Sequence, residues 1–309
     1  MPGTYNPSLV KFETVDGLKL PGLLYRSGRS TRAAIYLHGN GSSSVFYDAD
    51  EVNALAEALN GAGIAFFPFN NRGAHYIKTF KVERNGTPKR IKMGTTYELI
   101  KDCVKDIDAA IGFLQRQGFR EFILIGISTG ANKICVYNHY RPDNPVGEYV
   151  LLSGGDDTGL YYQMMGEKKF RAALAKSKSE TAAGRGERMV PKYLVDYPFS
   201  YQALWDTINP DGDYNVFPYN EAMNTVHLST KPLFHMMGEI AKPSLVMYGE
   251  LDEYCYGDVP RCVETLKAHM TGKSNISYRI LPGADHGFNG YEAALAQEIT
   301  NWITTHDKR

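Results

Sequence analysis

The sequence has 309 residues, of which 43% are hydrophobic and 22% are charged, and its formal net charge is zero. This balance is typical of a globular protein with a large core, and it argues against nucleic acid or an anionic membrane as partner. No stretch approaches the roughly 18 apolar residues of a membrane span, the four cysteines are too few for a disulfide framework, and the N-terminus lacks a secretory pattern, so we expect a cytoplasmic protein.

The first half of the chain alternates strand and helix patterns. Its predicted strands lie at residues 10–15, 18–25, 33–37, 64–69, 122–127 and 149–152, and its predicted helices at 50–59, 95–117 and 129–140. Asp16-Gly17 predicts a hairpin turn between the first two strands. Thr95-x-x-Glu98 predicts a capping box at the start of the long helix that Gly118 ends. Alternation of this kind is typical of a parallel sheet with helices on both faces.

The alternation breaks between residues 155 and 240, where helices are expected at 172–179 and 201–208. It resumes with strands at 244–248 and 276–281, a helix at 259–269 and a last amphipathic helix through Leu295 and Ile303. We therefore predict an α/β core domain made of residues 1–154 and 241–309. Residues 155–240 are predicted to form a helical lid, inserted after the sixth strand.

Gly126-Ile-Ser128-Thr-Gly130 matches G-x-S-x-G between a predicted strand and a predicted helix. In that context the serine stands on a sharp turn at the carboxyl edge of the sheet, and the glycines remove bulk that would collide with the flanking elements. Ser128 is therefore the predicted nucleophile. A glycine-rich loop with an incidental serine is the simpler interpretation, and the strand-turn-helix context argues against it.

A serine hydroxyl needs a general base and a group that orients the base. The acid and then the histidine follow the serine in chains with this turn, and His286, in a glycine-flanked loop after the last strand, fits that order. Four other histidines are weaker candidates because they lie in the insert, near a helix end or in the terminal segment: His227, His235, His269 and His306.

The predicted acid is Asp252, which follows the strand at 244–248 directly. A carboxylate there can accept the Nδ1 proton of the histidine and fix its tautomer. Its competitors are Glu250, Glu253, Asp156 and Asp157. Asp285, next to the base in sequence, is expected to brace its loop.

An oxyanion hole needs two backbone N–H donors. Thr129, after the nucleophile, supplies one, and Asn40 in His38-Gly39-Asn40-Gly41, after the third strand, is the expected second donor. This chemistry requires no cofactor and no metal, and the histidine and cysteine spacings indicate no zinc site.

These motifs, with Asn70-x-Arg72-Gly73, resemble the α/β-hydrolase superfamily from Ala33 to the final helix, the insert excepted. Members commonly have aspartate where Asn70 stands, a departure outside the triad. The resemblance implies the α/β-hydrolase fold, and the elbow and single lid are similar to small carboxylesterases and acyl hydrolases.

We expect hydrolysis of a small-molecule ester through an acyl-enzyme. The insert is rich in aromatic residues and methionine, which favours an apolar or aromatic acyl or alcohol group. The same triad serves amide, thioester, lactone or carbon–carbon bond hydrolysis and acyl transfer, and a ligand-binding receptor with slow turnover is the alternative from another class. The basic segment 78–92, with a turn at Asn85-Gly86, is either a solvated loop or a steering device for anionic substrates.

Overall fold

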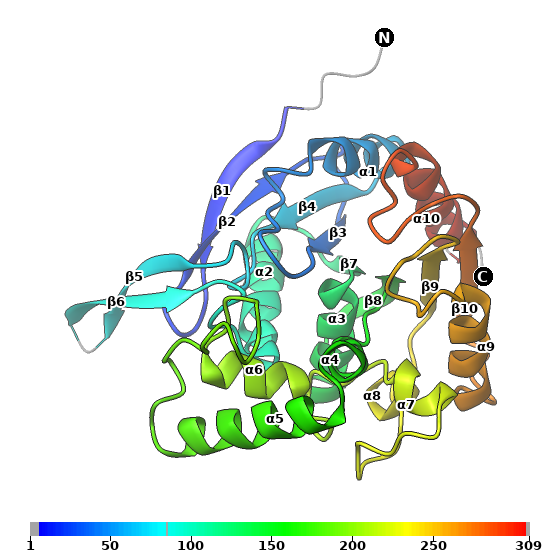
Figure 1. Ribbon diagram of the computed structural model, residues 1–309. Helices are drawn as coiled ribbons and strands as arrows, with labels where there is room; N and C mark the ends of the chain where they lie inside the picture. The colour runs from blue at the N-terminus through cyan, green and yellow to red at the C-terminus, as the bar shows by residue number, and fades with distance from the viewer. Residues whose placement is uncertain (1–5, 85, 307–309) are drawn as a thin grey trace.

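An eight-stranded sheet forms the centre of the computed structural model, which describes residues 6–84 and 86–306 (Figure 1). The strands of this sheet are β1 (Ser8–Glu13), β2 (Lys19–Leu24), β3 (Arg32–Leu37), β4 (Ala65–Phe69), β7 (Glu121–Ile127), β8 (Val146–Leu152), β9 (Ser244–Gly249) and β10 (Ile276–Leu281). Their spatial order is β1-β2-β4-β3-β7-β8-β9-β10. All neighbours from β4 to β10 are parallel, while β1 and β2 are antiparallel additions at one edge.

The central strands are apolar along their length because both faces of the sheet are covered. Every residue of β4 and of β9 is buried, as is typical of parallel strands between two helical layers. Parallel strands also bring their carboxyl ends to one edge. The loops that carry Ser128, Asp252 and His286 all begin at that edge.

Helices form a layer on each face of the sheet (Figure 1). α1 (Ala49–Gly61) and α10 (Glu292–His306) share one apolar cluster with the sheet. α2 (Cys103–Arg116), α3 (Thr129–Tyr140) and α9 (Val259–His269) share the other. The two clusters together form the core of the protein.

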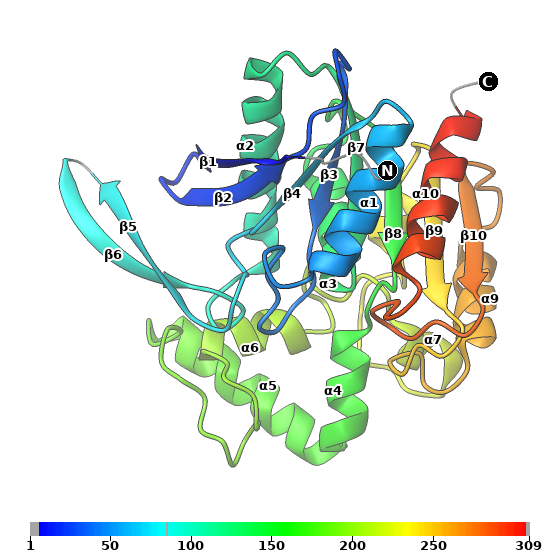
Figure 2. The ribbon, with the colours of Figure 1, turned by 90° about the horizontal axis from the view of Figure 1, so that it is seen from above.

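Residues 155–240 follow β8, the sixth strand of the main sheet in chain order. Their helices are α4 (Asp157–Met165), α5 (Glu167–Ala182), α6 (Tyr201–Ile208), α7 (Tyr219–Met223) and α8 (His235–Gly238). α4, α5 and α6 lie beyond the carboxyl ends of the strands (Figure 2) and surround a separate apolar cluster that includes Phe170 and Leu204. The later part, with Tyr219 and Met237, packs into the main core instead. The division into core and lid at residues 155 and 240 stays a prediction.

The basic segment forms a two-stranded ribbon of β5 (Lys78–Arg84) and β6 (Thr87–Met93). It projects from the body of the molecule (Figures 1 and 2). Asn85, half of the expected turn, lies outside the described residues, whereas Gly86 has a φ of 73°.

The expected capping box at Thr95 and Glu98 is wrong. The Thr95 hydroxyl donates to the carbonyl oxygens of Gly41 (2.8 Å) and Gly73 (3.0 Å), and Glu98 forms an ion pair with Lys133 at 2.7 Å. α2 begins at Cys103, after a short 3₁₀ turn, η1 (Ile100–Asp102). Both polar side chains bind partners on other segments instead of the N–H groups of a helix start. A local motif does not show that such distant partners are present.

Within the described residues, no helix is long and apolar enough to cross a membrane. All four cysteines are buried free thiols. The cytoplasmic location stays a prediction.

Candidate active site

Ser128 occupies the turn between β7 and α3. Its φ of 54° and ψ of −124° lie in a region that residues with a side chain rarely adopt. The neighbouring glycines make this turn possible: a Cβ on Gly126 would lie 2.4 Å from the carbonyl group of Gly130, and a Cβ on Gly130 would lie 2.1 Å from the carbonyl oxygen of Leu37. The structure thus gives the G-x-S-x-G segment the expected turn, with Ser128 facing a cavity.

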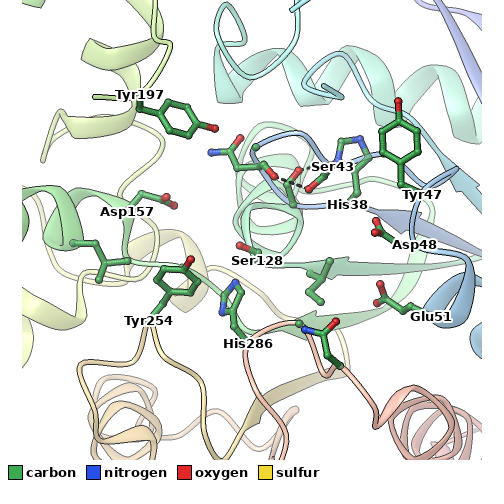
Figure 3. Close-up of a pocket in the computed structure, with 18 of the residues that line it drawn as sticks. His38, Ser43, Tyr47, Asp48, Glu51, Ser128, Asp157, Tyr197, Tyr254 and His286 are labelled. Carbon is green, nitrogen blue, oxygen red and sulfur yellow. Dashed lines mark hydrogen bonds between the residues drawn. The ribbon is translucent and has the colours of Figure 1, made fainter. Parts of the chain in front are cut away.

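His286 and Asp252 meet in loops that follow the neighbouring strands β10 and β9. The Nδ1 atom of His286 lies 2.9 Å from Oδ1 and 3.0 Å from Oδ2 of Asp252. The Asp252 side chain is 1% exposed and that of His286 is 16% exposed. Because Nδ1 is engaged with the carboxylate, Nε2 is the ring atom left to exchange a proton with a reacting group. His286 and Ser128 line the same cavity (Figure 3).

The other carboxyls near this pair bind backbone or loop groups. Glu250 accepts a hydrogen bond from the Gly283 N–H at 2.8 Å, and Glu253 accepts one from the His286 N–H at 3.2 Å. Asp285 accepts two 2.8 Å hydrogen bonds from Asn289. These contacts brace the loop that carries His286.

Asp156, a further competitor, is tied to the insert. It accepts hydrogen bonds from the backbone of Gly159 and Asn220 at 2.8 and 2.7 Å and from the Tyr256 hydroxyl at 2.8 Å. The histidine candidates His227, His235 and His269 do not line the cavity, and the side chain of His306 lies outside the described residues.

His38 does line the cavity, and burial lowers its pKa to about 3. Its Nε2 accepts a hydrogen bond from the Asn71 N–H at 3.2 Å, and its Nδ1 lies 2.8 Å from the Gly39 carbonyl oxygen. The neutral ring therefore fixes the backbone at the start of the loop that contains Asn40.

Asn40 and Thr129, the expected oxyanion residues, flank Ser128. Within the described part of the chain, neither backbone N–H has an intramolecular acceptor. Gly39 keeps the Asn40 loop close to the nucleophile, since a Cβ there would lie 3.1 Å from the Ser128 Cβ. Two unsatisfied N–H groups beside a serine hydroxyl can donate hydrogen bonds to a negatively charged oxygen.

Tyr214, which sequence reasoning missed, joins these two residues. The Asn40 side-chain amide donates a hydrogen bond to the Tyr214 hydroxyl, which lies 3.3 Å from Oγ1 of Thr129. Tyr214 comes from the segment between α6 and α7 and is 5% exposed. It was one of many aromatic residues in the insert, and no spacing or motif distinguished it.

The cavity in front of Ser128 has a volume of about 880 Å³. One wall is largely aromatic and apolar and consists of Leu160, Tyr161, Met164, Tyr197, Phe199 and Tyr254. The other wall carries Asp48, Asp50, Glu51 and Glu292, while Asp157 faces the cavity from the start of α4. Figure 3 shows Asp157 on one side of Ser128 and Asp48 and Glu51 on the other. Among the described lining residues, none is lysine or arginine.

Burial perturbs three of these carboxyls. It raises the pKa of Glu51 to about 7, against a hydrogen bond of 2.8 Å from the Tyr36 hydroxyl that lowers it. Burial and the neighbouring Asp156 raise the pKa of Asp157 to about 6, and burial also raises that of Asp48. Perturbed carboxyls in a cleft are a common property of functional sites. Of these three, only Asp157 was a candidate from the sequence, as a competitor for the triad acid, and no motif marks Asp48 or Glu51.

Residues 93–306 match the model of a family described as "Protein of unknown function (DUF1749)". No curated protein matches the sequence.

Solved structures resemble almost the whole chain. The Pyrococcus furiosus esterase Pf2001 is 16% identical, with a TM-score of 0.58 over 98% of this chain and 92% of that chain. Est1E from Butyrivibrio proteoclasticus is 12% identical, with a TM-score of 0.58 and coverage of 97% and 99%. Mouse alpha/beta hydrolase domain-containing protein 10 is 16% identical, with a TM-score of 0.57 and coverage of 96% and 99%. The α/β-hydrolase fold predicted from the sequence is confirmed.

Proposed function

The chain belongs to the DUF1749 family, whose function is unknown, and we propose that it is a serine hydrolase that cleaves carboxylic esters through an acyl-enzyme intermediate. The observation that carries the proposal is the pairing of His286 with Asp252 at 2.9 and 3.0 Å, in a cavity that Ser128 enters from a strained turn. A nucleophile, a base and a carboxylate that orients the base are the parts that acyl transfer requires.

In the proposed reaction, Oγ of Ser128 attacks the ester carbonyl carbon while Nε2 of His286 takes the hydroxyl proton. The buried Asp252 carboxylate stabilises the imidazolium that forms. The N–H groups of Asn40 and Thr129 stabilise the negative oxygen of the tetrahedral intermediate. His286 then protonates the leaving alcohol, and water, activated by the same ring, releases the acid and restores Ser128.

The cavity walls narrow the class of ester. The aromatic wall suits an apolar or aromatic group, and ferulic acid, which is bound in one structure of Est1E, is an example of an aromatic acyl group. The carboxyl-bearing wall disfavours a substrate with a second, free carboxylate, because like charges repel in a partly desolvated site. We therefore propose a neutral or cationic ester with one apolar part.

The first test is turnover of p-nitrophenyl esters, from acetate to decanoate, by wild type and Ser128→Ala. We expect wild-type turnover that the variant loses, with the same folded circular dichroism spectrum. Asp252→Asn is expected to lower kcat by about 10⁴-fold, because the histidine loses its correct tautomer. Glu250→Gln, which alters a carboxyl in the same loop, is the matched control and is expected to retain most activity.

The other outcomes separate the alternatives. Activity that survives Ser128→Ala would refute the nucleophile. A folded wild type without ester turnover would favour amide, thioester, lactone or carbon–carbon bond cleavage, or acyl transfer. Stoichiometric ligand capture without repeated turnover would favour the receptor.

A further inference from the structure

The Tyr214 hydroxyl lies between the two residues of the proposed oxyanion hole. It accepts a hydrogen bond from the Asn40 side-chain amide and lies 3.3 Å from Oγ1 of Thr129. Because Asn40 supplies a proton to the phenol oxygen, the phenol's own proton is available to Thr129. Burial raises the pKa of Tyr214 well above its usual value, so the hydroxyl stays protonated.

Tyr214 is itself anchored to the helix that follows the nucleophile. The buried Asn132 on α3 directs its amide nitrogen toward the Tyr214 carbonyl oxygen at 3.5 Å and the Gly155 carbonyl oxygen at 2.8 Å. It accepts a hydrogen bond from the Gly155 N–H at 3.1 Å. The tyrosine ring packs in the main core with Phe217. Ring and backbone are thus fixed, and the hydroxyl is presented at a defined position.

Two hydrogen bonds hold Asn40 itself, in a loop that Thr95 also contacts at the Gly41 carbonyl oxygen. The Ser43 hydroxyl donates to the Asn40 carbonyl oxygen at 2.5 Å, and the Asn40 side chain is held by Tyr214. The first contact fixes the loop locally, whereas the second ties it to the insert. Losing the second would let the Asn40 N–H turn away from the reacting oxygen, while the aromatic cavity wall would remain unchanged.

We propose that Tyr214 is a positioning residue that aligns Asn40 and Thr129 as oxyanion donors, so that the insert between β8 and β9 contributes to transition-state stabilisation. This inference rests on the proposed function. Removing an oxyanion donor costs about 10²- to 10³-fold in kcat. Because Tyr214 acts through the donors, the expected loss is smaller.

The test is Tyr214→Phe, which keeps the buried ring and removes only the hydroxyl. We expect kcat for a p-nitrophenyl ester to fall about tenfold, with KM within about twofold. The reason is that the hydrogen bonds from the Asn40 and Thr129 N–H groups to the oxyanion form only in the transition state. A boronic acid inhibitor that forms a tetrahedral adduct with Ser128 should bind more weakly by the same factor. Thermal unfolding verifies that the variant is folded.

Tyr140→Phe is the matched control. The Tyr140 hydroxyl donates to Asp213, the residue before Tyr214, at 2.7 Å, but it lies at the far end of α3 from Ser128. We expect this variant to leave kcat and boronic acid affinity unchanged. In Asn40→Ala, which keeps its backbone N–H, adding Tyr214→Phe should cause a smaller further loss than in the wild type, because the contact between Asn40 and Tyr214 is already absent and only the contact with Thr129 is left to remove.

Equal losses in both tyrosine variants, a loss confined to KM, or additive effects of Asn40→Ala and Tyr214→Phe would overturn the positioning role. A Tyr214→Phe enzyme with wild-type kcat would overturn it as well, while Ser128-dependent turnover still upheld the proposed function. Absence of Ser128-dependent turnover in the folded wild type would instead refute the proposed function, and the role of Tyr214 with it.

Discussion

Glu51 lies in the cavity wall at a cost in folding free energy. Its Oε2 accepts a hydrogen bond from Tyr36, but Oε1 is buried without a hydrogen-bond partner in the described part of the chain. Burial raises the pKa of this carboxyl from 4.5 to about 7. The folded protein therefore binds a proton that the unfolded chain has already released between these pH values, and Glu51 lowers stability as pH rises through that window.

Glu51→Gln should consequently stabilise the protein at alkaline pH. The amide cannot ionise and can still accept the Tyr36 hydrogen bond, so the gain over wild type should grow between pH 5 and pH 8 to about 1–3 kcal/mol. Urea unfolding at both pH values measures the gain. Glu57→Gln, at an exposed position on the same helix, is the control and should show no such trend. A gain that does not change with pH would contradict the assignment.

Among individual residues, those that belong to a sequence motif could be predicted, whereas those that only folding brings together were missed. Ser128, His286 and Asp252 could be named because each follows a strand at the same sheet edge. Their roles stay predictions. Tyr214 and Glu51 carry no local signal, since their contacts join segments 174 and 15 residues apart.

Arg72, in the loop after β4, connects that loop to α2 and to the β1–β2 turn. Its guanidinium is 1% exposed and contacts Asp106 on α2 at 2.7 Å and Asp16 in the β1–β2 turn at 3.0 Å. The backbone N–H of Arg72 adds a 2.8 Å hydrogen bond to the same Asp106. Although partial burial opposes it, hydrogen bonds from Arg72 and Thr14 lower the pKa of Asp16 to about 2.

Removing this arginine should leave the buried Asp106 carboxylate without its counter-charge. We expect Arg72→Met to lower the free energy of unfolding by about 3–5 kcal/mol. Arg141→Met removes a surface ion pair between the residue after α3 and Asp108, which is also on α2, and should cost no more than about 1 kcal/mol. Denaturant unfolding measures the loss of unfolding free energy in both variants. Similar losses in the two would show that the buried ion pair contributes no more to stability than the surface pair.

Helices whose start and end are both marked by nearby residues were predicted best. The helix Val259–His269 has its predicted bounds, and Asp258 caps it through the Arg261 N–H at 3.0 Å. α3 also begins and ends as predicted. α4, α7 and α8 were not predicted, because they are short and their apolar residues face several partners in the insert and core. Short helices with contacts of this kind lack a clear period.

The whole molecule has no net charge, but its charges are unevenly distributed. Five carboxyl residues line the cavity: Asp48, Asp50, Glu51, Asp157 and Glu292. Basic residues gather on the β5–β6 ribbon, where Lys89, Arg90 and Lys92 are exposed and do not line the cavity. A cleft lined by one sign of charge concentrates its field locally. The charge of the substrate should therefore affect kcat/KM through the cavity carboxyls, and the ribbon should have little influence on kcat/KM.

Three p-nitrophenyl esters of matched length test this at pH 8: heptanoate, 6-aminohexanoate and the monoester of adipate. We expect the adipate ester, with its free carboxylate, to have a kcat/KM at least about tenfold below that of heptanoate, and the cationic ester to be at least equal to heptanoate. Glu292→Gln with Asp50→Asn should narrow the difference in kcat/KM between the adipate ester and heptanoate.

The ribbon is the control. Reversing the charge of Lys89, Arg90 and Lys92 should change neither the ratios of kcat/KM among the three esters nor their salt dependence. A selective loss of adipate turnover in the ribbon variant would instead indicate steering of anions by the ribbon, and equal rates for the three esters would refute charge selection by the cavity.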